Sequence, residues 1–318
     1  ARKAVARIIE YSARLAEHQD RLSLHAVDIA NLLRESDFHA RGLEASRIED
    51  DHVRQALVSA DYRSGRIRDE FLRGFSDGST LISLTGRVVG QINALSVLST
   101  GGYEFGLPNR ISATCQYGDG DIIHIERDVK LSGSIHSKGV MILSAWLSSR
   151  FAREQHLPLT ATLTFEQSYA EIDGDSASLG ELCAIVSAVA DLPIRQDMAV
   201  TGSVNQFGEV QPVGGVNEKV DGFHDACVAH GDIAGKAVIL PATNVQNLML
   251  DVRVRDAARD HDFGVYPVST VEEALELLLG MPAGKPDAKG QYPDNTVYGR
   301  IERRLSELRR RQDDEKSG

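Results

Sequence analysis

Residues 159–190 contain the pattern that most restricts how this chain can fold. A strand-like run from Leu159 to Phe165 leads into a turn of Asp, Gly and Ser residues. Beyond the turn, apolar residues repeat at helical spacing, namely Leu179, Leu182, Cys183, Val186 and Val189. The pattern predicts a strand, a polar turn and a helix in succession, with Ser176 at or just before the start of the helix.

Ser176 has two interpretations at this position. The first backbone N–H groups of a helix are unpaired, and with the helix dipole they favour negative charge on a ligand or a developing oxyanion. A serine beside them is therefore a candidate nucleophile. Alternatively, Ser176 is only the N-cap residue that begins the helix.

A second pattern follows in the chain. Two short strand-like runs, within 198–204 and 208–215, are joined by a glycine-containing turn and predict a hairpin. Gly214 and Gly215 then lead into a helix whose apolar stripe consists of Val216, Val220, Phe223 and Cys227. Lys219 stands three residues after Val216 and four before Phe223, so its stem should border that stripe.

Lys219 has two interpretations as well. A lysine beside a buried stripe loses water, which lowers its pKa and leaves some neutral amine near pH 7. A neutral amine can act as the general base toward a serine hydroxyl. The alternative is a surface lysine whose amine reaches past the stripe into solvent.

These residues together resemble the proteolytic domain of Lon proteases. The family has its serine in a Gly-x-Ser-Ala turn and its lysine at the end of a Gly-Gly-x-x-x-Lys run. Ser176 and Lys219 match these positions, and their separation of 43 residues is that of the family. Residues 174–178, preceded by Phe-Glu-Gln-Ser-Tyr at 165–169, are similar to the B-type branch. Arg195, Thr201-Gly202 and residues 212–215 also fall in the family's register.

The resemblance implies an ATP-dependent serine endopeptidase that hydrolyses unfolded or damaged proteins through a Ser176–Lys219 dyad, with Ala177 among the supporting residues. Thr201 either hydrogen-bonds the Lys219 amine or is simply a good strand former. A carboxylate that pairs with Lys219 would keep the lysine protonated and inactive. We therefore expect Asp173 to gate the dyad until assembly or substrate binding displaces it; the alternative is that Asp173 and Asp175 only shape the turn and cap the helix.

Helical patterns fill the first 75 residues, which by themselves show no chemistry. By the resemblance, residues 1–75 are the small helical lid of an AAA+ ATPase, and Arg34 is either a nucleotide-sensing arginine or a surface residue. The sequence has no Gly-x-x-x-x-Gly-Lys-Ser/Thr phosphate loop, so we expect no cofactor in this fragment. ATP and Mg²⁺ are expected for the full-length chain, with the ATPase core upstream.

Strands alternating with helices predict an α/β domain over residues 79–281. Strands are expected at 80–84, 87–98, 111–116, 122–126, 236–240 and 265–268, and helices at 134–153 and 245–260. The resulting fold class is an α/β (α+β) Lon proteolytic domain preceded by an all-α AAA+ lid. Residues 282–318 are expected to be a linker and a charged helix that docks on a neighbour or on its own domain.

Other residue types restrict the function classes. His136 and Lys138 cannot share a helix face, so both are assigned to solvent or an interface, and no metal site is predicted. Three cysteines are too few for a disulfide framework or a cysteine-based zinc site. A net charge of −11, from 35 Lys and Arg against 46 Asp and Glu, argues against general binding to nucleic-acid phosphates.

We expect a cytoplasmic protein, because no signal peptide and no apolar run of about 20 residues is present. The missing initiator Met suggests a fragment of a longer chain. The resemblance further implies a homohexamer that acts on unfolded protein substrates, requires no nucleic acid and does not bind membranes. The alternative function is a degenerate Lon-like domain that serves as a scaffold or oligomerisation module without peptidase activity.

Overall fold

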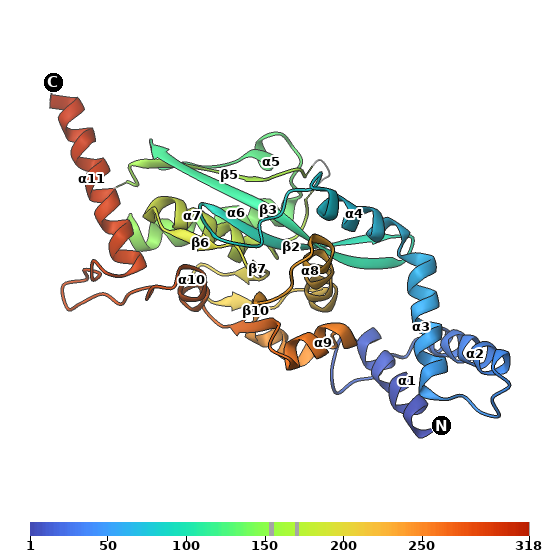
Figure 1. Ribbon diagram of the computed structural model, residues 1–318. Helices are drawn as coiled ribbons and strands as arrows, with labels where there is room; N and C mark the ends of the chain where they lie inside the picture. Colours follow the sequence, from blue (N-terminus) through green and yellow to red (C-terminus); the bar gives the residue numbers. More distant parts are fainter. Residues whose placement is uncertain (153–155, 169–171, 318) are drawn as a thin grey trace.

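The computed structural model describes residues 1–152, 156–168 and 172–317 (Figure 1). Tyr169 and Glu171, which flank the expected serine motif, lie outside these ranges, as does Arg153 at the end of an expected helix. The first part of the chain is helical, as predicted. A small apolar core of Ala4, Leu32, Val53 and Ala56 holds the first three helices together. The helices are α1 (Arg2–Leu15), α2 (Ala26–Gly42), α3 (Asp50–Ser64) and α4 (Arg66–Asp77).

A mixed sheet of seven strands forms the centre of the remaining chain, in the order β11-β10-β7-β2-β3-β5-β4. The pairs β2–β3 and β3–β5 are antiparallel, and the other neighbours run parallel. The strands are β2 (Gln91–Thr100), β3 (Tyr103–Tyr117), β4 (Ile122–His124), β5 (Leu159–Phe165), β7 (Met198–Val200), β10 (Lys236–Pro241) and β11 (Phe263–Val268).

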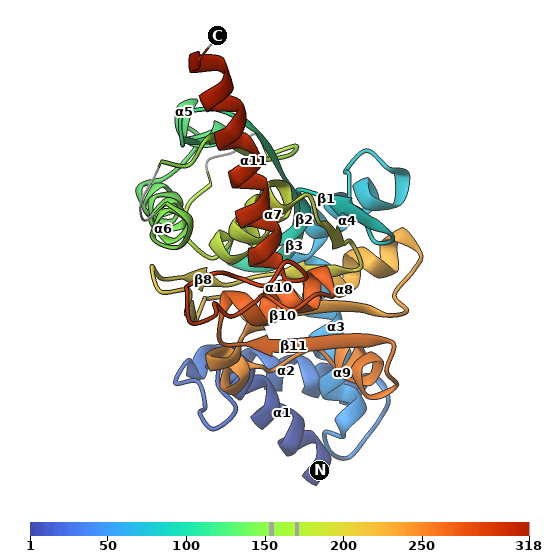
Figure 2. The same cartoon turned by 90° about the vertical axis from the view of Figure 1, so that its left-hand side faces the viewer.

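Side chains alternate between the two faces of this sheet, and each face has its own core. On β10, Ala237 and Ile239 belong to one core, whereas Val238 and Leu240 belong to the other. The first core includes α6 (Ser134–Phe151), α7 (Ser178–Ala190), α10 (Val271–Leu279) and α11 (Val297–Ser317), which are labelled in Figure 2. The second includes α8 (Val216–His230) and α9 (Val252–Arg259). A helix α5 (Ile125–Asp128) follows β4, and a 3-10 helix (Ala242–Asn247) follows β10.

Several predicted elements differ from the structure. The strand expected at 87–98 is divided at Gly90, and residues 125–126 of the strand expected at 122–126 already belong to α5. The helix expected at 245–260 is divided into the 3-10 helix and α9. Residues 80–84 are not a strand, because the Thr80 N–H donates to the Gly74 carbonyl and the Leu81 N–H donates to the Gln167 side chain rather than to a neighbouring strand. The predicted hairpin is shorter than expected, since β7 joins the large sheet. The hairpin that forms consists of β8 (Ser203–Val204) and β9 (Val210–Gln211). Elsewhere, β1 (Arg87–Val89) pairs with β6 (Pro193–Arg195).

The C-terminal helix α11 docks on its own domain, which is one of the two arrangements expected from the sequence; the other was docking on a neighbour. Val297, Ile301, Leu305 and Leu308 are all buried in the core that contains α7. Within the described ranges, no helix is both long enough and apolar enough to cross a bilayer.

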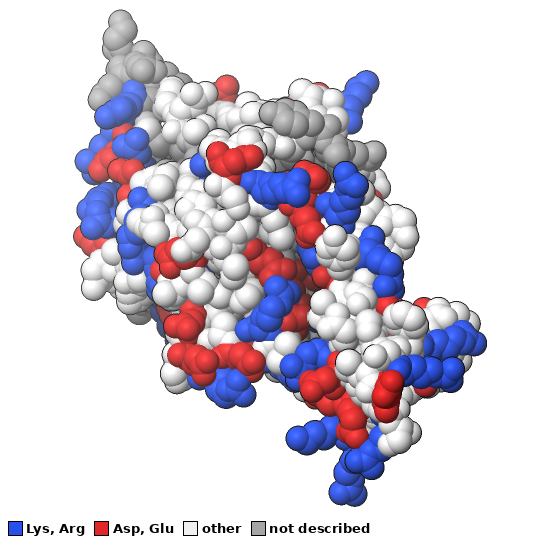
Figure 3. All heavy atoms as spheres, turned by 45° about the vertical axis from the view of Figure 1, so that its right-hand side comes forward, with Lys and Arg blue, Asp and Glu red and all other residues white. Residues whose placement is uncertain are grey.

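The N-terminal helices contact the second face of the sheet domain. Arg14 of α1 lies 2.8 Å from the Asp221 carboxylate and 3.6 Å from that of Glu218, both on α8, and it donates to the Met249 carbonyl at 2.8 Å. The side chain of Asn247 donates to the Glu17 carbonyl at 2.8 Å. On the face that Figure 3 shows, basic and acidic side chains lie intermixed.

Candidate active site

Ser176 lies two residues before the first residue of α7, as the sequence predicts. Its carbonyl accepts a hydrogen bond from the Gly202 N–H at 2.8 Å, and the Leu179 N–H donates back to the Gly202 carbonyl at 3.0 Å. The serine turn is therefore fixed to the chain that leaves β7. Gly174 begins this turn with a φ of 94°, a conformation that favours glycine.

The hydroxyl of Ser176 does not cap the helix. Ala177 is the N-cap residue, and it makes no side-chain cap. The neighbouring Ser178 hydroxyl is occupied, because it accepts from the Val204 N–H at 3.1 Å. Within residues 1–152, 156–168 and 172–317, the Ser176 hydroxyl makes no hydrogen bond. The side chain thus remains available for chemistry, although the residue is only half-buried.

Lys219 occupies the first turn of α8 and is buried, with 3% of its surface exposed. This rules out the alternative in which its amine reaches into solvent. Burial lowers the pKa of Lys219 to about 8, and the nearby charges of Asp175 and Glu218 oppose that shift. The predicted desolvation is therefore confirmed, and a fraction of the amine is neutral near pH 7.

Close backbone packing brings Lys219 to this position. A methyl group added at Gly106 of β3 would overlap the Glu218 carbonyl and would lie 2.7 Å from the Lys219 Cα. A methyl group on Gly222, one turn further along α8, would overlap the Gly106 backbone. The helix can approach the strand this closely only because both positions are glycine. Neither glycine was predicted from the sequence as part of the site.

The two aspartates before the serine have different environments. Asp175 accepts a hydrogen bond from the Ser203 hydroxyl at 2.8 Å, and its charge acts on Lys219. Asp173 is exposed, accepts from the Gly174 N–H at 2.9 Å and packs against Gly133 at the start of α6. Asp173 therefore shapes the turn in this structure. Its expected gating of Lys219 stays a prediction, and of the two aspartates Asp175 is the one whose charge acts on the amine here.

Thr201 links the serine turn to the sheet. It is fully buried, its N–H donates to the Ile239 carbonyl at 3.0 Å, and its hydroxyl donates to the Ser176 carbonyl at 3.3 Å. The predicted bond to the Lys219 amine is not among the hydrogen bonds of the described residues. Thr201 thus holds the Ser176 main chain in place through the hydrogen bond to the Ser176 carbonyl.

His136 was assigned to solvent or an interface, and this assignment is wrong. The side chain is 1% exposed, and its Nε2 lies 2.7 Å from the Glu181 carboxylate of α7. The spacing to Gly139, Val140 and Leu143 places His136 on the buried face of α6. That spacing was the available signal, and Lys138 is exposed as expected. Glu181, on an apolar helix, was missed entirely.

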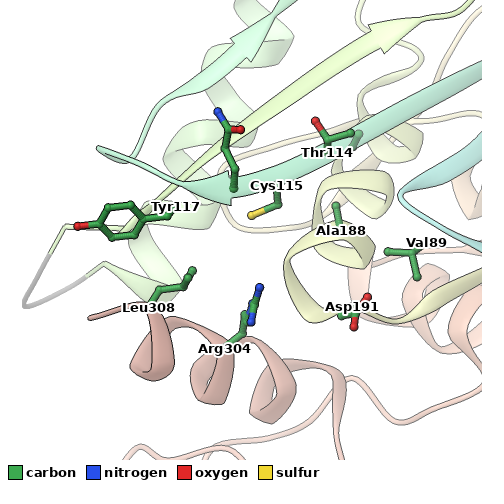
Figure 4. A pocket seen from close by; sticks show the side chains of 10 residues that line it. Val89, Thr114, Cys115, Tyr117, Ala188, Asp191, Arg304 and Leu308 are labelled. Atoms are coloured by element: carbon green, nitrogen blue, oxygen red, sulfur yellow. The ribbon is translucent and has the colours of Figure 1, made fainter. Parts of the chain in front are cut away.

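A hollow elsewhere in the domain is separate from these residues. Figure 4 shows it between β3 and α11, with Cys115, Arg304 and Leu308 along its wall and Asp191 at its edge. Its volume is about 330 Å³. None of the predicted site residues contributes to its lining.

Comparisons with known proteins match two parts of the chain. Residues 1–63 match the archaeal LonB AAA+ ATPase LID domain, and residues 121–281 match the C-terminal proteolytic domain of Lon protease (S16). The expected fold, a mixed α/β proteolytic domain behind an all-α lid, is confirmed.

Two relatives illustrate the similarity. A protein of Escherichia coli (strain K12), whose name describes it only as a homolog of Lon protease, is 43% identical over 257 residues. An archaeal Lon protease of Archaeoglobus fulgidus is 27% identical over 277 residues. The alignments cover 79% and 87% of this chain, but each covers 42% of the relative. The chain therefore spans about two fifths of the length of these relatives.

Proposed function

The chain belongs to the Lon protease family, and from this premise we propose that it is a serine endopeptidase unit with a Ser176–Lys219 dyad. The observation that carries this proposal is the buried Lys219 amine, whose pKa of about 8 suits a general base. With that pKa, roughly a tenth of the amine is neutral at pH 7. Asp175, whose charge favours the protonated amine, would stabilise Lys219 after it accepts a proton.

The proposed reaction begins when neutral Lys219 removes the hydroxyl proton of Ser176. The serine oxygen attacks the scissile carbonyl, and Lys219 passes the proton to the leaving amine. An ester with Ser176 remains, and a water molecule then hydrolyses it, again with Lys219 as base. No histidine takes part in these steps.

The start of α7 supplies donors for the oxyanion. In the described part of the chain, the N–H groups of Ser176 and Ala177 donate to no other group. Each such donor typically contributes about 3 kcal/mol to transition-state stabilisation. We assign the supporting role of Ala177 to this N–H, and the role of Thr201 to holding the Ser176 backbone in place.

We further propose that the whole protein depends on ATP and Mg²⁺ and acts as a cytoplasmic homohexamer on unfolded proteins. The match of residues 1–63 to an ATPase lid supports the link to ATP. The 318 residues contain no phosphate loop that could hold a nucleotide, so no step above involves one. Arg34 is exposed on α2 and donates to the Asn31 side chain at 3.1 Å, which leaves it accessible to a neighbouring domain.

A serine-directed acylating probe tests the dyad in the chain as it stands. We expect covalent labelling of Ser176, detected by peptide mass spectrometry, and complete loss of labelling in Ser176→Ala and Lys219→Ala. The matched control is Ser134→Ala, because Ser134 is an exposed serine at the start of another helix. Labelling that survives Ser176→Ala, or that is absent from the parent protein, would instead favour the scaffold function.

A further inference from the structure

A buried group of imidazoles and carboxylates lies behind the first turn of α7. We propose that His124, His136 and Glu181 form a binding site for a divalent transition-metal ion of the Zn²⁺ type. The three residues come from the end of β4, the first turn of α6 and the first turn of α7. They thus join three separate elements of the fold.

The donor atoms converge on one point. His136 Nε2 lies 2.7 Å from Glu181 Oε1, and His124 Nε2 lies 3.5 Å from the same oxygen. One ligand atom from each residue lies within 4.8 Å of the others. Zinc bonds of about 2.0–2.1 Å in a tetrahedral site place neighbouring donors about 3.3 Å apart. The observed separations bracket that value, so small side-chain movements would complete the site.

The second nitrogen of each imidazole faces a further polar group. His136 Nδ1 lies 2.8 Å from the Ser132 hydroxyl, and His124 Nδ1 lies 3.2 Å from Glu126 Oε2. Glu126 is itself held by the Phe165 N–H at 2.7 Å. Metal-binding histidines usually present one nitrogen to the metal and the other to a carboxylate or hydroxyl, which fixes the ring.

Several polar atoms of this group have no hydrogen-bond partner among the described residues. They are His124 Nε2 and one oxygen of Glu181, together with His124 Nδ1 and Glu126 Oε2, which lie 3.2 Å apart without the geometry of a hydrogen bond; all are inaccessible to solvent. Native proteins rarely bury unpaired polar atoms. An ion held by both imidazoles and Glu181 would give His124 Nε2 a partner, and its charge would balance the two carboxylates.

Donor type selects the class of ion. Two imidazole nitrogens with one carboxylate suit zinc and related transition metals, whereas Mg²⁺ and Ca²⁺ prefer oxygen donors. An incoming ion would take the place of the proton between His136 Nε2 and Glu181, so that proton is released on binding.

The location indicates a positioning role. Glu181 follows Ser176 by five residues, and the Gly133 N–H at the start of α6 donates to the Ile172 carbonyl at 2.8 Å. An ion between α6 and α7 would hold both sides of the segment that carries the serine turn. It would not contact substrate, because all three ligands are buried.

Zinc binding can be measured without any peptidase assay. The full chain, stripped with a chelator and dialysed, is titrated with Zn²⁺ by calorimetry and checked for bound metal by mass spectrometry. We expect one ion per chain, a higher Tm with zinc, and proton release. Glu181→Gln and His136→Gln should abolish this binding, and Glu126→Gln should weaken it about 10- to 100-fold. His224→Gln is the matched control, since His224 is a buried histidine outside the group.

X-ray absorption at the zinc edge of the parent protein is a second measurement of the ligands, and it does not require that any variant folds. Two imidazole ligands with an oxygen ligand would support the assignment. The proposal is overturned if no ion binds at equimolar level, or if Glu181→Gln binds as tightly as the parent. It is also overturned if the spectrum lacks imidazole. These results would leave a hydrogen-bonded or hydrated His–Glu network, and none of them bears on the Ser176–Lys219 dyad.

Discussion

Replacing Lys219 by methionine should stabilise the protein at neutral pH. Burial lowers the pKa of this amine from 10.5 to about 8. One pKa unit corresponds to about 1.4 kcal/mol, so a folded chain that carries this charge at pH 7 loses about 3 kcal/mol relative to the unfolded chain. Methionine has a similar length and no charge, and it therefore avoids this loss.

The pH dependence of the effect identifies its cause. As pH rises from about 8 to 10.5, the folded protein releases the Lys219 proton while the unfolded chain still holds it, so the parent gains stability. The advantage of Lys219→Met should therefore fall from about 3 kcal/mol at pH 7 to about 1 kcal/mol at pH 10. Urea unfolding of both proteins across this range measures the difference. Lys138→Met is the control, because Lys138 is exposed.

A difference in unfolding free energy that stays constant between pH 7 and pH 10 would refute the reasoning. Lys219 would then not be held in a dry environment, and the case for a neutral general base would be lost. A pH-dependent difference of the same size in Lys138→Met would likewise show that burial is not the cause.

Three more predictions follow from contacts around this helix. Asp175→Asn removes a charge that raises the Lys219 pKa, so the rising limb of the peptidase pH profile should shift to lower pH, and an unchanged midpoint would contradict this. Gly106→Ala should cost about 1–3 kcal/mol in urea unfolding, because the methyl group overlaps the α8 backbone. Burial raises the pKa of Asp221 to about 6, so its carboxylate is charged at pH 7 and largely protonated at pH 5. Arg14→Met should therefore reduce stability more at pH 7 than at pH 5, and equal losses at both would exclude a charge effect.

Local patterns allowed the helices and strands around the site to be predicted. The strand at 159–165 has the predicted bounds, and α8 begins directly after Gly215. These elements depend on periodicity and turn residues close in sequence. The prediction for residues 80–84 failed because their hydrogen bonds go to side chains and turns outside any strand, and the Leu81 N–H donates to Gln167, more than 80 residues away. A contact of that kind leaves no trace in a local pattern.

The candidate site was predicted in part for the same reason. The burial of Lys219 follows from its spacing on one helix. The close approach of Gly106, the ionic influence of Asp175 and the burial of His136 against Glu181 all arise between separate elements. Rejecting a shared face for His136 and Lys138 was correct, but it did not justify assigning both residues to solvent or an interface, since one of the two faces the core.

Arg14 connects the N-terminal helices to α8, the helix that carries Lys219. It reaches Asp221 and Glu218 on α8, and Glu218 is the residue next to Lys219. A movement of α1 away from the sheet would break these ion pairs or displace the first turn of α8, which carries Lys219. The helical part of this chain is thus attached to the residue adjacent to Lys219, the proposed base.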